Sequence, residues 1–347
     1  MNRSFKPFLA LLLCLAMVLP LGACSGEGKS ETRRVTALGG LADITVYGKN
    51  ASSAIPEAEA ALKSVDAMVN TFDESSRIYA VNHSDGEAVV VSAQVASMIE
   101  TARMVSKQTE GALDLTVYPL MDAWGFLSGS YTVPDEDTIA ALLKHTGMDR
   151  VNLSADQESG DYMLQLTGGA QITLDCVARG AATNAAISAL RTKGVKSAVI
   201  SMGGNVQTLG VKPDGSKWNI AIMDPNDKNA YIGYLTLGET AVVTSTPTEL
   251  SFTQRGALYH HIMNPETGMP ASTAVRSMTI VCADAQMADC LSTALFVLGE
   301  RKALQYWRDH HGFEMLMITQ DGRIVCTNGL LGAFTLTGGD YQVNYVK

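Results

Sequence analysis

The sequence is short of positive charge. Its 26 Lys and Arg residues are outnumbered by 35 Asp and Glu, which gives a formal net charge of −9 at pH 7 over 347 residues. This balance argues against a nucleic-acid partner, because binding a phosphate backbone needs clustered positive charge. Repeats and low-complexity stretches are also missing from residues 35–347, so we expect one continuous unit with a sizeable core.

The cysteine spacing of a zinc site is missing too. Four cysteines lie beyond residue 24, and their spacing matches no zinc motif. Apolar neighbours such as Val281, Leu291 and Val325 indicate buried free thiols. A disulfide is the alternative that an exported location would permit. The four residues are Cys176, Cys282, Cys290 and Cys326.

The apolar run at residues 8–19 is too short to cross a bilayer comfortably. It follows the basic residues Arg3 and Lys6, and small residues precede Cys24. This pattern predicts a lipoprotein signal at residues 1–23, which is cleaved to leave a lipidated Cys24. The alternative is an ordinary signal peptide with an incidental cysteine.

Cleavage at this point would place the protein on the extracytoplasmic face of a bacterial membrane. Residues 24–34 would form a polar tether and residues 35–347 the folded domain. The signal carries two basic residues and no acidic one, so the mature 324 residues (347 minus 23) have a net charge of −11. Each buried CH₂ of the lipid contributes ~0.8 kcal/mol to membrane attachment.

Helical and strand patterns follow one another without strict alternation, and the strands outnumber the helices. This predicts an α+β architecture with antiparallel strand pairs rather than a doubly wound parallel sheet. The expected helices are residues 55–69, 95–109, 135–146 and 178–193. The expected strands are residues 41–47, 171–174, 197–201, 218–223, 232–237, 241–245, 277–282 and 314–319.

A candidate cation site lies near the end of the chain. If Asp284 caps a helix, Asp289 and Thr293 lie one turn apart on one face of it. A carboxylate plus a hydroxyl suits Mg²⁺ when water, a backbone carbonyl and phosphates complete the octahedron. A buried Asp without a partner is costly, which favours a ligand role. The apolar positions of this helix are Ala288, Leu291, Leu295 and Leu298.

Other segments carry chemistry only in combination. His261 is a candidate proton acceptor, although a single histidine is more often structural. Residues 111–126 could bind a ligand or simply pack aromatic side chains into the core. The glycines in residues 201–205 allow close backbone approach or a tight turn. The hydroxyls at residues 244–246 could meet phosphate or satisfy a strand end.

Taken in order, these segments resemble the ApbE family, the FAD:protein FMN transferases that act outside the cytoplasmic membrane. The resemblance runs from about residue 38 to 299. The matching blocks are residues 65–82, 111–126, 178–180, 203–205, 244–245, 261–268 and 288–293.

This resemblance implies an α+β fold related to the tunnelling fold, with FAD as substrate and Mg²⁺ as cofactor. It implies transfer of FMN to a Thr or Ser of an exported or membrane redox protein, with release of AMP. His261 matches the general base. The positions that match flavin contacts are Leu38, Phe72, Ala112, Leu113, Asp114, Thr173 and Arg179. The positions that match metal ligands are Asp289, Thr293 and the carbonyl of Cys176.

Several flavin-contact positions depart from the family pattern. Two glycines are replaced by Asp175 and Cys176, which would crowd or shift the flavin. Phe72 stands where a tyrosine is common and therefore lacks the hydroxyl. Two alternatives to a transferase follow: a lipid-anchored flavin-binding protein without transfer activity, and an FAD pyrophosphatase that gives FMN and AMP with water as acceptor.

Overall fold

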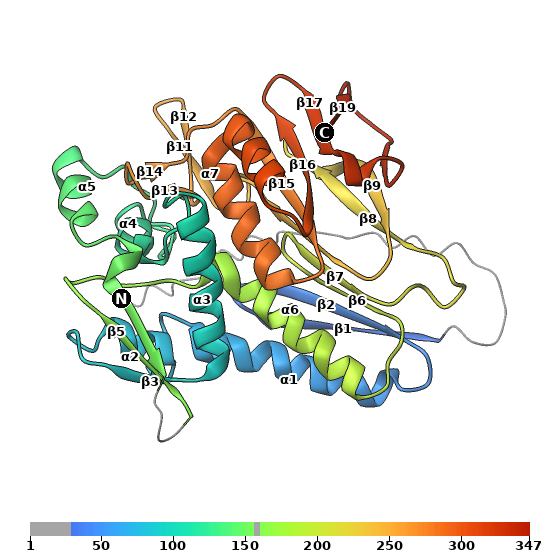
Figure 1. The fold of residues 1–347 in the computed structure, drawn as a ribbon, viewed down its shortest axis with the longest axis horizontal. Coiled ribbons are helices and arrows are strands. Elements are labelled where there is room, and N and C mark those ends of the chain that lie inside the picture. The colour runs from blue at the N-terminus through green and yellow to red at the C-terminus, as the bar shows by residue number, and fades with distance from the viewer. Residues whose placement is uncertain (1–28, 156–159) are drawn as a thin grey trace, which may run out of the picture.

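The computed structural model describes residues 29–155 and 160–347. The predicted signal and the lipidated Cys24 lie outside the described residues. The fold is α+β, as predicted, and is built on a nine-stranded mixed sheet in the order β1-β2-β6-β7-β10-β15-β16-β17-β19 (Figure 1). Within the described ranges, no helix combines the length and apolarity needed to span a bilayer.

The helices differ in how they are begun and ended. Asp284 caps α7 by accepting the N–H groups of Gln286 and Met287, as the sequence predicts. The same helix is interrupted at Gly299, whose φ of +74° is not helical. The α-helices are α1 (Ala51–Val69), α2 (Arg77–Asn82), α3 (Ala93–Gln108), α4 (Tyr118–Ala123), α5 (Glu136–Leu143), α6 (Asp175–Thr192) and α7 (Ala285–Asp309). The 3₁₀ helices are η1 (Leu115–Val117), η2 (Met148–Arg150) and η3 (Asn328–Leu330).

Most neighbouring strands pair antiparallel; β17 and β19 pair parallel. The strands of the main sheet are β1 (Ser30–Ala37), β2 (Gly40–Tyr47), β6 (Ala198–Met202), β7 (Asn205–Leu209), β10 (Ala241–Ser245), β15 (Val275–Cys282), β16 (Phe313–Thr319), β17 (Arg323–Thr327) and β19 (Gln342–Val346). The other strands are β3 (Val89–Val91), β4 (Val151–Ala155), β5 (Tyr162–Leu166), β8 (Trp218–Asp224), β9 (Asp227–Leu237), β11 (Ser251–Gln254), β12 (Ala257–His260), β13 (Met263–Asn264), β14 (Met269–Pro270) and β18 (Phe334–Leu336).

Both faces of the main sheet are covered, because side chains alternate along each strand. On β15, Met278 and Ile280 pack into the core that α1, α3, α6 and α7 share with one face. Val281 points to the opposite face and packs with Trp218 and Ile220 of the small β18-β9-β8 sheet. The central strands therefore read as continuous apolar runs rather than alternating ones.

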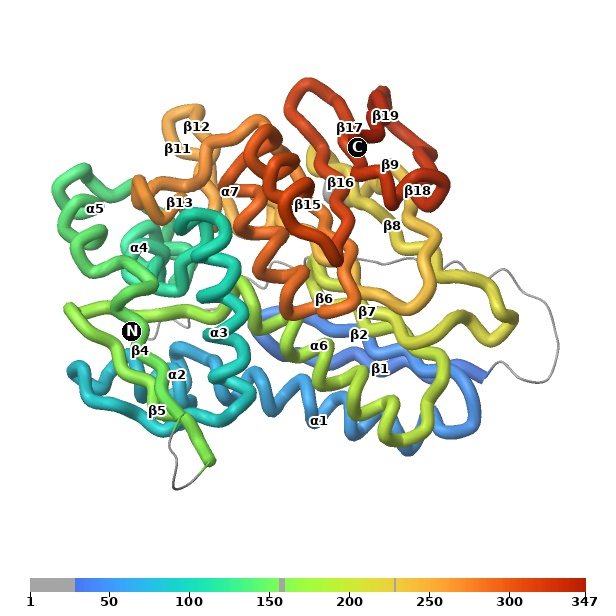
Figure 2. The backbone as a smooth tube through the Cα atoms, viewed as in Figure 1, coloured from blue at the N-terminus to red at the C-terminus, as the bar shows by residue number. Residues whose placement is uncertain are grey.

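A third apolar cluster joins the α4 region to the segment of β11 to β13. Leu120 and Trp124 of the α4 region pack there with Met263 of β13 and with two aromatic residues of the β11–β12 hairpin, Phe252 and Tyr259. Figure 2 shows the hairpin and β13 beside α4. The block at residues 111–126 thus does bury aromatic side chains, which was one of its two interpretations.

The predicted strand at residues 171–174 is wrong. No strand is assigned to this segment, and a side chain bonds its backbone instead of a neighbouring strand. Asn82 donates its amide N–H to the Ile172 carbonyl at 2.8 Å and accepts the Ile172 N–H at 2.8 Å. One asparagine satisfies both backbone groups of a buried residue, which a neighbouring strand would otherwise do.

We predict that Asn82→Ala lowers the free energy of unfolding by about 1–3 kcal/mol, because it leaves the buried N–H and C=O of Ile172 without a hydrogen-bond partner. Urea denaturation of the full-length chain measures this. Asn219→Ala is the matched control, since Asn219 is exposed and its amide oxygen accepts a hydrogen bond from the Thr236 hydroxyl at 2.9 Å. Equal stability of the two variants would contradict this role of Asn82.

Candidate active site where helices α6 and α7 meet

Helices α6 and α7 pack closely together at Gly180. A Cβ on this residue would lie 2.1 Å from the backbone oxygen of Ala285 at the start of α7. The approach brings the Gly180 N–H to Oδ2 of Asp289 at 2.9 Å. Any side chain at position 180 would push the helices apart and remove this contact.

The Gly180 N–H also places Asp289 near the carbonyl of Cys176. An α-helix directs the N–H of residue i toward the carbonyl of residue i−4, and for Gly180 that carbonyl belongs to Cys176. The Asp289 carboxylate and the Cys176 carbonyl therefore lie beside one amide group. Burial raises the pKa of the Cys176 thiol, which is inert as a nucleophile or metal ligand in its protonated form.

Asp289 is 8% exposed, and burial is the main cause that raises its pKa to about 6. The Gly180 N–H and Arg179 oppose this rise by stabilising the charged form. Thr293 lies one helical turn from Asp289, and its hydroxyl meets that of Ser245, at the end of β10, at 3.3 Å. A carboxylate, a carbonyl and two hydroxyls are thus gathered between α6, α7 and the end of β10.

An ion pair joins α6 to the loop that precedes the β11–β12 hairpin. The Arg179 guanidinium lies 2.6 Å from the Glu249 carboxylate, and both side chains are partly buried. Gly203, in the turn between β6 and β7, packs against this pair: a Cβ there would lie 3.5 Å from Arg179 and 3.6 Å from Glu249. The turn leaves backbone, rather than a side chain, facing the pair.

His261 lies just beyond the β11–β12 hairpin, and the carbonyl of Leu250 holds it in two ways. This oxygen accepts the His261 backbone N–H at 3.1 Å and lies 3.3 Å from Nδ1 of the ring. A proton on Nδ1 that is donated to this carbonyl leaves Nε2 as an acceptor. Burial lowers the pKa of His261, Glu249 raises it and Arg179 lowers it. The net lowering of the pKa favours the neutral ring, which is the form that can accept a proton.

The segments before α6 complete the polar network. Asp114 accepts the N–H and the hydroxyl of Thr116 at 2.8 and 2.6 Å, and burial raises its pKa. The Thr173 N–H donates to the carbonyl of Leu115 at 2.9 Å, and the Thr173 hydroxyl accepts the N–H of Asp175 at 3.2 Å. These contacts fix the backbone that leads into the first turn of α6.

The four apolar residues expected to contact flavin differ from one another in their exposure. Leu38 occupies the turn between β1 and β2 with a φ of +50°, and Ala112 and Leu113 are buried. Phe72, just after α1, is 62% exposed, so its ring face is available to a planar ligand. Electrostatic interactions with Arg179 and Glu249 link His261 and Asp289. Asp114 and Thr173 instead hold the backbone before α6. The four apolar residues take part in neither set of contacts.

The donor set fits Mg²⁺ only as an open site. The described residues contain no group of three or more His, Cys, Asp or Glu side chains suited to a metal. Mg²⁺, however, usually keeps several waters and binds one or two carboxylates plus substrate phosphates. Asp289 supplies a buried carboxylate that forms no ion pair with any residue of the described ranges. Thr293 and the Cys176 carbonyl supply neutral oxygens. A cation would relieve the cost of ionising Asp289.

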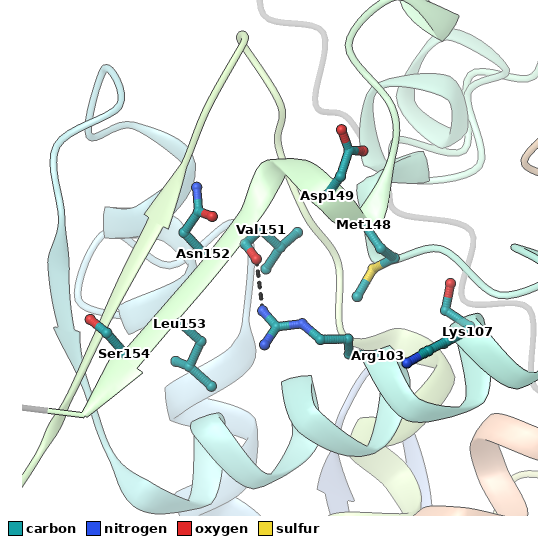
Figure 3. A pocket seen from close by; sticks show the side chains of 9 residues that line it. Arg103, Lys107, Met148, Asp149, Val151, Asn152, Leu153 and Ser154 are labelled. Carbon is teal, nitrogen blue, oxygen red and sulfur yellow. Dashed lines mark hydrogen bonds between the residues drawn. The ribbon is translucent and has the colours of Figure 1, made fainter.

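A separate hollow of about 600 Å³ lies between α3 and β4 (Figure 3). The side chain of Arg103 lies in it and donates to the carbonyl of Val151 at 2.7 Å. Its other polar groups include Lys107, Asp149 and Asn152. None of the predicted site residues lines this hollow, so it is not the candidate active site.

Comparison with known proteins decides the family. The model of the ApbE family matches residues 38–317. The chain belongs to the ApbE family. Two similar ApbE relatives are called FAD:protein FMN transferase: one from Treponema pallidum is 28% identical over 93% of this chain and 94% of that protein, and one from Klebsiella pneumoniae is 30% identical over 81% of this chain and 87% of that protein.

Solved ApbE structures share the fold. The ApbE protein of Thermotoga maritima superposes with a TM-score of 0.81 at 30% identity, covering 88% of this chain and 99% of that one. The family resemblance and the α+β class inferred from the sequence are both confirmed. The roles of the individual site residues remain predictions.

Sequence reasoning gave no role to Glu249, whose partner Arg179 lies 70 positions earlier in the chain. It also gave Ser245 no contact with α7, although the hydroxyls of Ser245 and Ser292 meet at 2.8 Å. The only available signal was the Thr-Ser ending of a strand and the charge at Glu249 shortly after it. Neither pairing can be read from local spacing.

We predict that the metal-free protein loses stability relative to its Asp289→Asn variant as the pH rises from about 4 to about 6. A raised folded-state pKa means that the native protein binds a proton more tightly than the unfolded chain, so stability is lost as that proton leaves. The difference should reach up to about 3 kcal/mol, at about 1.4 kcal/mol per pKa unit. Urea titrations in EDTA at several pH values measure it, and a pH-independent difference would contradict it.

Proposed function

We propose that this chain is a Mg²⁺-dependent FAD:protein FMN transferase that acts on a Thr or Ser hydroxyl of an exported or membrane redox protein. Its relatives of similar length carry the name of this activity. The observation that supports the metal dependence is the convergence of Asp289, Thr293 and the Cys176 carbonyl. The observation that supports proton transfer is the contact of His261 Nδ1 with the Leu250 carbonyl, which leaves Nε2 as an acceptor. Arg179 and Glu249 link this ring electrostatically to the same cluster.

In the proposed reaction the acceptor oxygen forms a bond to the phosphorus of the FMN half of FAD. The bond from that phosphorus to the oxygen bridging to AMP breaks, and AMP leaves with that oxygen. The hydroxyl proton goes to Nε2 of His261, which is free because Nδ1 faces the Leu250 carbonyl. Such a transfer depends mainly on positioning and charge stabilisation, so few protein groups are needed.

Asp289, Thr293 and the Cys176 carbonyl would hold the cation, which when bound stabilises negative charge on pyrophosphate oxygens. Arg179 would add positive charge near the same carboxylate. The flavin would lie toward the exposed Phe72, between the Leu38 turn and the backbone of Ala112, Leu113, Asp114 and Thr173. Asp175 and Cys176, in place of the family's two glycines, would narrow the approach to the first turn of α6.

We predict that Asp289→Ala abolishes FMN transfer and that Thr293→Val reduces it at least about tenfold, because each removes a ligand oxygen. The assay combines the full-length chain in mild detergent with FAD, Mg²⁺ and a redox domain that carries one target threonine. Intact mass spectrometry reads the addition of FMN, and EDTA should prevent it. Asp309→Ala, at the exposed end of the same helix, is the control expected to retain full activity.

The same assay separates the alternatives. A flavin-binding protein without transfer activity would bind FAD and release no AMP. An FAD pyrophosphatase would form FMN at a rate unaffected by the acceptor. Full activity of Asp289→Ala would overturn the proposed metal site.

We also propose that lipid on Cys24 holds the enzyme at the extracytoplasmic face of the membrane, near its acceptor. We predict that Cys24→Ser moves the protein from the membrane to the soluble fraction in a bacterial host, because attachment depends on the acyl chains. Fractionation and labelling with a radioactive fatty acid measure this. Membrane retention without label would instead support an uncleaved signal segment.

A further inference from the structure

The β11–β12 hairpin carries His261, and its attachment to the rest of the site rests on few polar contacts. Ser251 pairs with His260 in the hairpin register, and the Leu250 carbonyl accepts the His261 N–H as the next pair. Leu250 therefore has a fixed position relative to His261. Its neighbour Glu249 is the residue that leaves the hairpin and pairs with Arg179 on α6.

Helix α6 is also the helix that presents the Cys176 carbonyl and whose Gly180 N–H holds Asp289. Arg179 lies between these two residues in the sequence. The Arg179–Glu249 pair thus joins the element that carries the proton acceptor to the helix that carries the candidate cation site. Its N–O distance of 2.6 Å and the partial burial of both side chains, 29% and 25% exposed, distinguish it from a solvated surface pair.

The opposite side of the hairpin is held differently. Phe252 and Tyr259 pack on Trp124 with ring centroids 6.4 and 5.2 Å apart. This aromatic contact anchors the hairpin but sets no direction for the His261 ring, because apolar packing is less directional than hydrogen bonding. The ion pair supplies the directional constraint.

We propose that Glu249 is a positioning residue for the transfer reaction: paired with Arg179, it fixes the Leu250 carbonyl that orients the His261 ring. The predicted loss of kcat rests on the proposed function. The predicted orientation of the His261 ring does not. Glu249 does not exchange a proton with substrate in this scheme. It acts on the ring through Leu250 and through its charge.

Several charged groups face His261. Glu249 comes from the loop before β11, Arg179 and Asp175 from α6, and His260 is the adjacent residue. Glu249 raises the pKa of His261, so its removal lowers that pKa. His261 accepts a proton only when neutral, so the acidic limb of kcat should move to lower pH in Glu249→Gln. A purely structural role for Glu249 would reduce activity without this shift.

The test compares Glu249→Gln with Glu249→Asp and with Glu300→Gln, all in the full-length chain. Glu300 is the matched control, since it pairs with Arg323 at 2.7 Å with similar exposure of the two side chains. We expect Glu249→Gln to lower kcat about 10- to 100-fold, as small misplacements of a catalytic group do. The KM for FAD should change less than about threefold, Glu249→Asp should recover part of kcat, and Glu300→Gln should match the parent chain.

A second readout does not depend on activity. Nitrogen-15 NMR of the histidine rings, assigned by His261→Gln, should show His261 mainly protonated on Nδ1, with a mixture of tautomers in Glu249→Gln. If the parent chain transfers no FMN, the proposed function fails and the NMR still decides the role of Glu249. Unchanged His261 signals would overturn the positioning role, as would a loss confined to KM or an equal loss in Glu300→Gln. If Glu249→Gln does not fold, Glu249→Asp gives the same comparison with the charge retained and the reach shortened.

Discussion

The close approach of α6 and α7 at Gly180 is the constraint on which the candidate site depends. A side chain at this position would collide with the backbone of Ala285. Without one, a helix N–H reaches the Asp289 carboxylate and holds it among buried groups. One hydrogen bond offsets only part of the cost of burying a charge. The residual cost appears as the raised pKa of Asp289, and it is the energy that a bound cation can recover.

The rest of the site is arranged around this unsatisfied charge. Arg179, next to Gly180 in sequence, contributes a positive charge. Glu249, at 2.6 Å, is the nearest negative charge and largely neutralises it. The Asp289 carboxylate is therefore not fully balanced by positive charge. A phosphate-bearing substrate would add more negative charge beside it. A divalent cation satisfies both at once. The same ion pair joins α6 to the segment before the β11–β12 hairpin. The proposed cation site and the proposed proton acceptor therefore share one framework.

Periodicity predicted the main helices and the central strands because their apolar faces are local features of the sequence. It failed at residues 171–174, where an apolar run of strand length is satisfied by Asn82 from α2 rather than by a strand. Asn82 lies 90 positions before Ile172, whose backbone groups it bonds. Such a contact is decided by tertiary structure, and no local pattern contains it.

The candidate site, like the fold, was predictable where its residues lie close together in the sequence. Asp289 and Thr293 share a helix, so their spacing already places them one turn apart. The link from Asp289 to Gly180 spans 109 positions and the pair Arg179–Glu249 spans 70, so only the fold reveals them. Asp175 and Cys176 illustrate the converse. Sequence marks them as unusual for the family, but the structure shows that the helix begins there without distortion, with the Asp175 N–H bound to Thr173. The proposed narrowing at the first turn of α6 would therefore come from the side chains of these two residues.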